Sequence, residues 1–297
     1  MTPPAEHCLD CHAPLAGRYC HECGQDNAHQ RLRLRTLLRD AAKDITGLET
    51  PLLCTTRSLL RHPGRLSLDY VRGRRRRYLS PLKYVMFIAA IYGTLSVLLG
   101  MYDRMNEMMG AAALVDPDDV LMTTVMAWSK QAQETLSAIL PLVSVPFVVG
   151  MAWLLYRDTN RTLAEHAVAV CYATALAMLL GLPGILINVF ASETVVILNG
   201  LAFIVINFAV LGWTWHGFYG KSIAQTLWRA AVAMLVSLIG SGLFGALIGM
   251  IAAILAAAYV TVQHGVELRP DPRATMPATM PATAPALAPT TTPIAAE

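Results

Sequence analysis

The sequence predicts an all-α polytopic membrane protein with about five transmembrane helices, preceded by a small N-terminal zinc ribbon and basic amphipathic helices. Three observations support this fold class. Hydrophobic residues make up 55% of the 297 residues and charged residues only 14%, against about 25% charged in an ordinary soluble domain. Several apolar runs are long enough to cross a bilayer, and four cysteines stand close together ahead of them. The composition therefore excludes an ordinary soluble globular protein.

Residues 1–30 are predicted to form the zinc ribbon, because they hold two Cys-x-x-Cys pairs separated by eight residues. Four thiolates suit a tetrahedral zinc ion, and Gly24 directly after the second pair allows a turn with positive φ. The eight-residue loop is long enough for a small β-hairpin that turns at Ala16-Gly17. So short a segment has almost no core, so metal binding would supply its folding free energy. The predicted ligands of a structural Zn²⁺ are Cys8, Cys11, Cys20 and Cys23.

Other roles of these cysteines are disfavoured. Disulfides need an oxidising compartment, whereas the basic residues that follow place this segment in the cytoplasm. Cys8-x-x-Cys11-His12 matches the attachment pattern of c-type haem, but this leaves the second pair unexplained. A redox Cys-x-x-Cys would need a βαβ context, which is absent. A histidine could replace one sulfur in the ligand set, and the candidates are His7, His12 and His21.

Residues 31–80 are predicted to form basic amphipathic helices on the membrane surface. Apolar residues recur at helical spacing over 34–48, and 52–60 repeats the pattern before Pro63-Gly64 stops it. Of the 23 Lys and Arg residues, 15 lie in residues 1–83, which suits an anionic cytoplasmic leaflet. The basic run can also be a topology signal alone, and nucleic acid is disfavoured because aromatic stacking residues are few. The predicted contacts to anionic lipid headgroups are Arg72, Arg74, Arg75, Arg76, Arg77 and Lys83.

Residues 81–265 contain the predicted transmembrane domain, since a span needs about 20 mostly apolar residues. The fifth apolar run would be a helix of about 54 Å. It therefore either tilts and projects into water or breaks at Gly240-Ser241-Gly242, and we expect five crossings. The tail over 266–297 is rich in Ala, Pro and Thr and is predicted to be disordered. The five runs are 82–101, 136–156, 166–190, 195–216 and 227–262.

The distribution of Lys and Arg predicts the orientation. Fourteen lie in residues 31–83, two in each of the loops 157–165 and 217–229, and none in 191–194. The remaining loop, 102–134, has two beside six acidic residues. By the positive-inside rule the N-terminus is cytoplasmic and the acidic loop is outside. We therefore expect a multi-pass protein of the bacterial inner membrane.

Ionisable residues are almost absent from the predicted spans, which argues against a pump. The main polar residues there are Asn188, Asn199 and Asn207. Asparagines in spans usually form hydrogen bonds between helices, but three that face one water-filled cavity would indicate a transport path. Gly245-x-x-x-Gly249 is typical of a close-packed helix face. No complete catalytic motif is present, so we expect no enzymatic activity.

Two stretches of the sequence resemble a known family. They are Cys8-x-x-Cys11…Gly17-Arg-Tyr-Cys20-x-x-Cys23-Gly24-Gln25 and the run from Leu59 through Pro63-Gly64 and the arginines to Tyr84. Together they are similar to the start of a bacterial family of membrane proteins, domain of unknown function 3667. The resemblance covers about residues 8–95. It implies a zinc ribbon and a basic entry into the membrane, and it adds no catalytic residue.

The function expected from the sequence is that of a non-enzymatic inner-membrane protein. Its cytoplasmic zinc ribbon would dock a partner protein or organise a membrane complex. The alternative is a small-solute or lipid transporter. A membrane enzyme that acts on lipid is a third class, which a cluster of histidines and acids at one membrane face would indicate.

Overall fold

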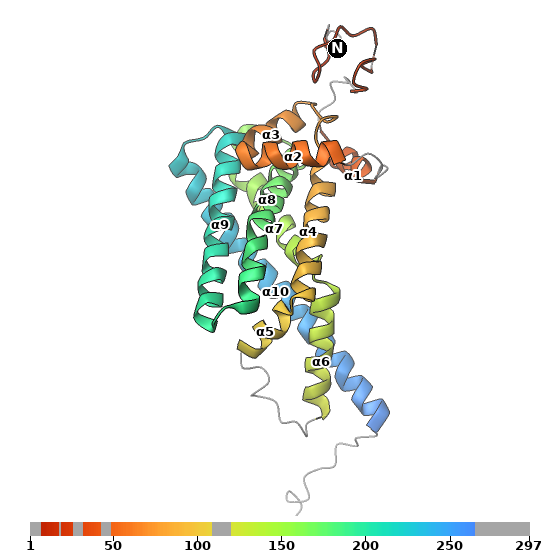
Figure 1. The fold of residues 1–297 in the computed structure, drawn as a ribbon, viewed down its shortest axis with the longest axis vertical. Helices are drawn as coiled ribbons and strands as arrows, with labels where there is room; N and C mark the ends of the chain where they lie inside the picture. Colours follow the sequence, from red (N-terminus) through yellow and green to blue (C-terminus); the bar gives the residue numbers. More distant parts are fainter. Residues whose placement is uncertain (1–6, 18, 26–31, 43–48, 109–119, 265–297) are drawn as a thin grey trace, which may run out of the picture.

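A computed structural model describes residues 7–17, 19–25, 32–42, 49–108 and 120–264. The described residues are mostly helical and contain no β-strand, as the predicted fold class requires (Figure 1). The tail predicted to be disordered, 266–297, lies outside the described residues. The helices are α1 (Leu34–Ala42), α2 (Glu49–Arg61), α3 (Pro63–Val71), α4 (Pro81–Leu98), α5 (Met101–Met108), α6 (Val120–Thr135), α7 (Leu140–Leu155), the short 3-10 helix η2 (Arg157–Thr159), α8 (Leu163–Phe190), α9 (Glu193–Tyr219) and α10 (Ile223–His264).

Four of the described helices, α4, α8, α9 and α10, are long and apolar enough to cross a membrane, which confirms the class of α-helical membrane protein. The span predicted over 136–156 forms a shorter helix than expected. Its first four residues form a turn, and α7 starts only at Leu140, with Pro141 in its first turn. The 16 residues of α7 extend for about 24 Å, less than the roughly 30 Å of a hydrocarbon core.

Helix α10 settles whether the last apolar run is one segment or two. It is a continuous helix of 42 residues that does not break at Gly240-Ser241-Gly242, and at about 1.5 Å per residue it is about 63 Å long. Its far end projects past the other spans and lies beside α6, where the rings of Trp128 and Tyr259 are 5.4 Å apart (Figure 1). Helices α5 and α6 form over the described part of the predicted loop 102–134, and neither is among the helices long and apolar enough to cross a membrane. Helix α6 has a weak apolar pattern of its own and packs on the projecting part of α10.

Helices α1, α2 and α3 lie across one end of the spans, and we call this end the cap (Figure 1). The sequence predicted a stop at Pro63-Gly64, but α3 begins there. Proline suits the first turn of a helix because its missing N–H needs no partner. A Cβ atom on Gly64 would lie only 2.6 Å from the Cα of Gly217 in α9. The Pro-Gly pair therefore starts a helix and lets two helix backbones approach each other closely.

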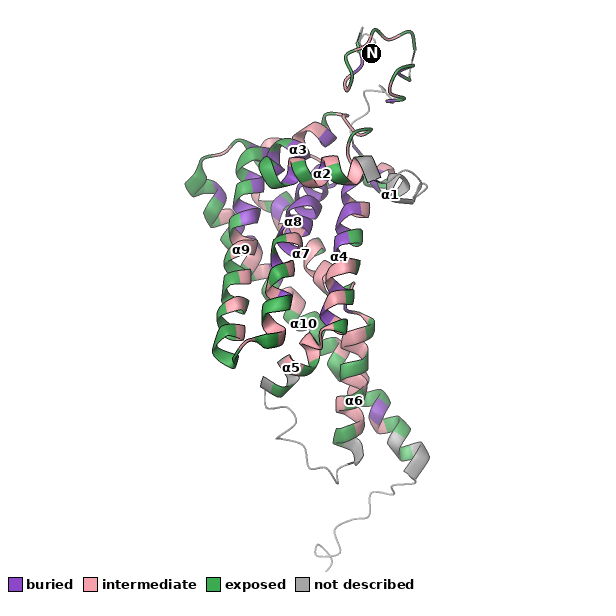
Figure 2. Cartoon of the chain, in the orientation of Figure 1, coloured by how far each residue is buried: buried purple, intermediate pink, exposed green. Residues whose placement is uncertain are grey.

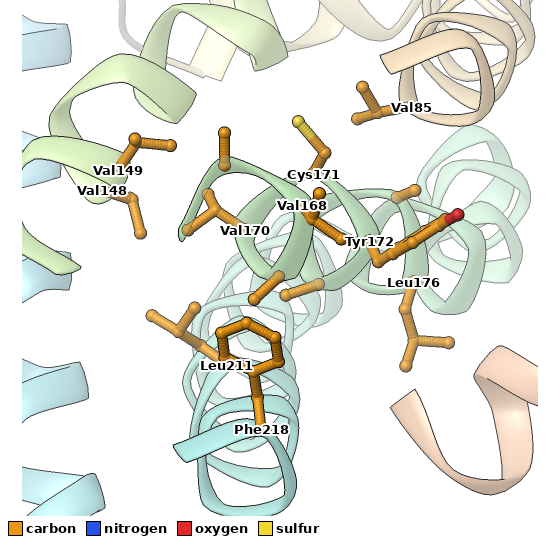
Figure 3. Packing of buried hydrophobic residues seen from close by; sticks show 14 of the residues in the cluster. Val85, Val148, Val149, Val168, Val170, Cys171, Tyr172, Leu176, Leu211 and Phe218 are labelled. Carbon is orange, nitrogen blue, oxygen red and sulfur yellow. The ribbon is translucent and has the colours of Figure 1, made fainter. Parts of the chain in front are cut away.

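The buried core lies directly beneath the cap (Figure 2). The first half of α8 is buried almost throughout, from Ala164 to Met178. Residues such as Val168 and Tyr172 of α8 pack there against Val85 of α4 and Phe218 of α9 (Figure 3). In the most apolar stretch of α10 no residue is buried, and in that of α9 only 11% of the residues are buried. Their exposed apolar surface suits contact with lipid, while the cap end is packed like a soluble domain.

Specific contacts place the connecting segments at alternate ends of the bundle. At the cap end, Thr162 Oγ1 donates to Leu32 O at 3.1 Å, and Lys221 Nζ lies 2.5 Å from Asp158 Oδ2. At the opposite end, the Arg104 guanidinium of α5 donates to the carbonyls that end α8. The segments after α7 and α9 thus share the cap end, as the alternation of Lys and Arg predicted.

Candidate metal centre

The four cysteines predicted as metal ligands lie together at the N-terminal end of the molecule. Their Sγ atoms are all within 4.8 Å of one another, and no histidine belongs to the group. Across the two pairs, Cys8 and Cys23 are 3.5 Å apart, as are Cys11 and Cys20. A tetrahedral zinc ion about 2.3 Å from each sulfur would separate the sulfurs by about 3.8 Å. All six cysteines are free thiols, so the geometry fits one four-coordinate metal ion.

The two Cys-x-x-Cys pairs fold into the same tight turn. In each pair the carbonyl of the first cysteine accepts a hydrogen bond from the amide four residues later, His12 N to Cys8 O at 3.1 Å and Gly24 N to Cys20 O at 2.9 Å. His12 and Gly24 have φ angles of 62° and 69°. The positive φ expected of Gly24 is confirmed. His12 adopts it too, and histidine is among the residue types that do so more often.

The segment between the two pairs differs from the prediction of a β-hairpin. In residues 7–17 and 19–25 an isolated antiparallel β-bridge joins His7 and Pro14 and encloses the first pair. Ala16 and Gly17 form a bend. This bridge is thus local to the first Cys-x-x-Cys turn.

Hydrogen bonding and burial shift the pKa values of two of these thiols in opposite directions. Burial raises the pKa of the Cys23 thiol to about 12. Burial also acts to raise the pKa of the Cys8 thiol, but hydrogen bonds from the backbone amides of Cys11 and Asp10 outweigh it and lower that pKa to about 6. Without a cation the four sulfurs therefore do not ionise together. A divalent metal ion stabilises all four thiolates at once.

The cysteine segment is fastened to residues 72–80, which we call the arginine loop, through the side chain of Gln25. Gln25 is 3% exposed. Its Nε2 donates to Gly73 O at 2.6 Å, and Arg76 N donates to its Oε1 at 2.9 Å. Both ends of one buried amide thus hold the loop backbone at points three residues apart.

Two arginine side chains reinforce this attachment. Arg74 Nε donates to Leu9 O at 3.0 Å. The guanidinium of Arg76 lies 3.9 Å from where a Cβ of Gly24 would stand. Part of the arginine run therefore has a structural role toward the cysteine segment, beyond that of a topology signal.

The far end of the arginine loop is anchored to the helices through Leu79. Leu79 N donates to Thr55 Oγ1 of α2 at 2.9 Å, and Tyr172 OH of α8 donates to Leu79 O at 2.6 Å. The ring of Tyr172 meets that of Tyr70 edge-on, with centroids 6.0 Å apart. Sequence reasoning did not find Thr55 or Tyr172, because nothing local marks their long-range partner, and Gln25 stood out only in the family motif.

Two of the three asparagines in the spans join neighbouring helices. Asn199 Nδ2 of α9 donates to Asn188 Oδ1 of α8 at 2.8 Å and to Gly184 O at 3.0 Å. Asn207 Nδ2 donates to Phe203 O of its own helix at 2.9 Å. The expected bond between helices thus forms at Asn188 and Asn199, which weakens the case for a transport path there.

Apolar helices long enough to span a bilayer, joined to a compact four-cysteine segment, define a polytopic α-helical membrane protein with a candidate metal centre. The model of the family described as "Protein of unknown function (DUF3667)" matches residues 50–93. The match supports the family resemblance that the sequence indicated, over α2, α3, the arginine loop and most of α4. No curated protein and no solved structure matches the chain.

Proposed function

We propose that this chain is a multi-pass protein of the bacterial inner membrane that acts without chemistry of its own. A structural zinc ion at the four cysteines holds the N-terminal segment on the arginine loop at the cytoplasmic face. The assembled surface docks a partner protein or organises a membrane complex. The observation that carries this proposal is the buried Gln25 amide, which joins the cysteine segment to the arginine loop at the entry to the first span.

Zinc is supported by how little else stabilises the segment. Within residues 7–17 and 19–25 the buried residues are Cys8, Cys20 and Gln25. Two of these three are candidate ligands, so the segment has no apolar core to offset the entropy of ordering it. Four thiolates at this spacing are typical of structural zinc, and such a closed site leaves no coordination position for a substrate.

The cytoplasmic position of the cap is supported by charge and by thiol chemistry. The segments that meet at the cap carry Arg157, Arg161 and Lys221 in addition to the arginine loop. Basic residues gather on the cytoplasmic side of membrane proteins. That compartment also keeps thiols reduced and able to bind metal. In the proposed orientation the arginines and Lys83 would contact anionic headgroups of the cytoplasmic leaflet.

The exposed face of the cysteine segment suits a protein partner. Tyr19 is 60% exposed, and aromatic side chains are enriched at protein interfaces. We therefore place a photo-crosslinking amino acid at Tyr19 in the full-length protein in native membranes, with Gln225 of α10 as the control position. A defined adduct is expected at Tyr19 alone. It should disappear in Cys11→Ser, because loss of zinc unfolds the segment.

Two results would refute the proposal: a Tyr19 adduct that persists unchanged in Cys11→Ser, or no Tyr19 adduct above the Gln225 background. A reporter fused after Met108 tests the orientation separately. It should report the periplasm, and a cytoplasmic signal would contradict the assigned sides.

A further inference from the structure

A hollow on the cap combines an unusual number of arginines with few acids. Two adjoining cavities of 410 and 530 Å³ share Arg65, Asp69, Arg77 and Tyr78 in their walls. The walls come from α2, α3, the arginine loop and Leu9 of the cysteine segment. Asp69 is the only acidic residue lining either cavity. The arginines are Arg57, Arg61, Arg65, Arg72, Arg74 and Arg77.

Within the part of the chain that the structure describes, most of this positive charge has no counter-charge. The carboxylate of Asp69 lies 3.8 Å from Arg74 Nη1, and Arg74 also donates to Leu9 O. Among the described residues, no carboxylate forms an ion pair with Arg57, Arg61, Arg65, Arg72 or Arg77. Like charges held together in one concave surface raise the local concentration of anions. The surface is therefore built to be neutralised by a ligand from outside.

The fold sets the positions of these guanidinium groups. Arg57 and Arg61 are one turn apart on α2, so their side chains project from one face. Arg65 follows just after the turn at His62 that brings α3 back beside α2. Arg77 is held from the third side by the arginine loop, whose ends are fixed by Gln25 and by Leu79. Three chain segments thus converge their side chains on one volume.

The chemistry of the walls indicates a phosphate-bearing ligand. Guanidinium groups donate in pairs to phosphate oxygens, and the hydroxyls of Ser58 and Tyr78 offer further donors. A single phosphate group carries about −1.5 to −2 charges at neutral pH, less than six arginines can neutralise. Basic pockets at the cytoplasmic ends of spans bind multiply charged lipid headgroups. Both charge and volume favour more than one phosphate group.

We infer that this hollow, the arginine cavity, binds an anionic ligand with at least two phosphate groups. The ligand is either a lipid headgroup with two phosphates or a soluble diphosphate. This goes beyond the docking function, because it assigns a specific ligand class to a site formed mainly by α2 and α3. The positions of Arg57, Arg61 and Arg65 on α2 and α3 do not depend on the zinc ion.

The test uses the purified full-length protein in a neutral detergent, with two probes. Pyrophosphate is titrated by calorimetry, and retention of cardiolipin, a lipid with two phosphodiester groups, is followed by native mass spectrometry. Arg65→Gln should weaken the binding of whichever probe occupies the site by about tenfold or more, equivalent to about 1.4 kcal/mol. The affinity of Arg65→Lys for the probe should lie between those of the wild-type protein and Arg65→Gln, because lysine keeps the charge but loses the paired donors. The matched control is Arg35→Gln, at an exposed position of α1 that lines neither cavity.

Each outcome decides the question. Binding of cardiolipin alone identifies a lipid site, and binding of pyrophosphate alone identifies a soluble ligand. Either result supports the inference only if Arg65→Gln weakens binding of that probe and Arg35→Gln does not. The inference is overturned if neither probe binds the wild-type protein, or if the two glutamine variants weaken binding equally. The zinc content of each variant is measured alongside, so that failure of this site is distinguished from failure of the metal centre.

Discussion

Replacement of Gln25 by alanine removes the attachment between the cysteine segment and the arginine loop without touching a cysteine. The variant loses the hydrogen bond to Gly73 O at 2.6 Å and the one from Arg76 N at 2.9 Å. Each such bond contributes roughly 1 kcal/mol net, so the loop should open more easily by about 2 kcal/mol. That is about a thirtyfold shift of the local opening equilibrium.

Amide hydrogen exchange at Arg76 measures this shift directly, because the Arg76 N–H is the group that loses its acceptor. The Leu79 amide serves as an internal control, since it donates to Thr55 Oγ1 and should keep its protection in the variant. Gln225→Ala, at an exposed position of α10, is the matched control substitution and should change neither amide. Unchanged exchange at Arg76 in Gln25→Ala would refute the attachment.

Two further perturbations test the packing and electrostatics of the cap. Gly64→Ala should lower the thermal midpoint in detergent, because its Cβ would stand 2.6 Å from Gly217 Cα and overpacking costs about 1–3 kcal/mol. Gly150→Ala, with nothing within 4 Å, should leave it equal or higher, and equal losses in both variants would contradict the close approach. Hydrogen bonding from Lys221 lowers the pKa of Asp158, so the stability from this ionised carboxylate is present above its ordinary pKa of about 3.9 and lost as the pH falls. Asp158→Asn should therefore reduce the loss of thermal midpoint between neutral pH and about pH 3, and an identical acid profile would count against this ion pair.

The sequence predicted the parts of the fold that depend on composition and local spacing. Length and apolarity identified the four helices that can span a membrane, and the spacing of the cysteines identified residues whose sulfurs do meet. Helix α7 is shorter than the predicted span because residues 136–139 form a turn and the helix begins only at Leu140, with Pro141 in its first turn. At the expected close-packed face, a Cβ added to Gly245 or Gly249 would meet no atom of the described residues within 4 Å.

What sequence reasoning missed depends on partners distant in the chain. Pro63-Gly64 has the pattern of a helix stop, although proline also suits the first turn of the next helix. The need for glycine at position 64 becomes visible only where Gly217 of α9 packs against it. Tyr172 lies in an apolar run like any other, and its bond to Leu79 O, 93 residues away, becomes visible only in the fold. The arginine cavity was missed for the same reason, because its walls require the turn between α2 and α3.

Metal analysis of the purified full-length protein tests the central claim most directly. A closed four-thiolate centre predicts about one zinc ion per chain. It also predicts that Cys20→Ser, which removes one candidate ligand, loses the ion, whereas Cys54→Ser, which leaves all four candidate ligands in place, retains it. A wild-type protein purified without chelators that carries no metal, or a Cys20→Ser variant that retains a full equivalent of zinc, would contradict the account.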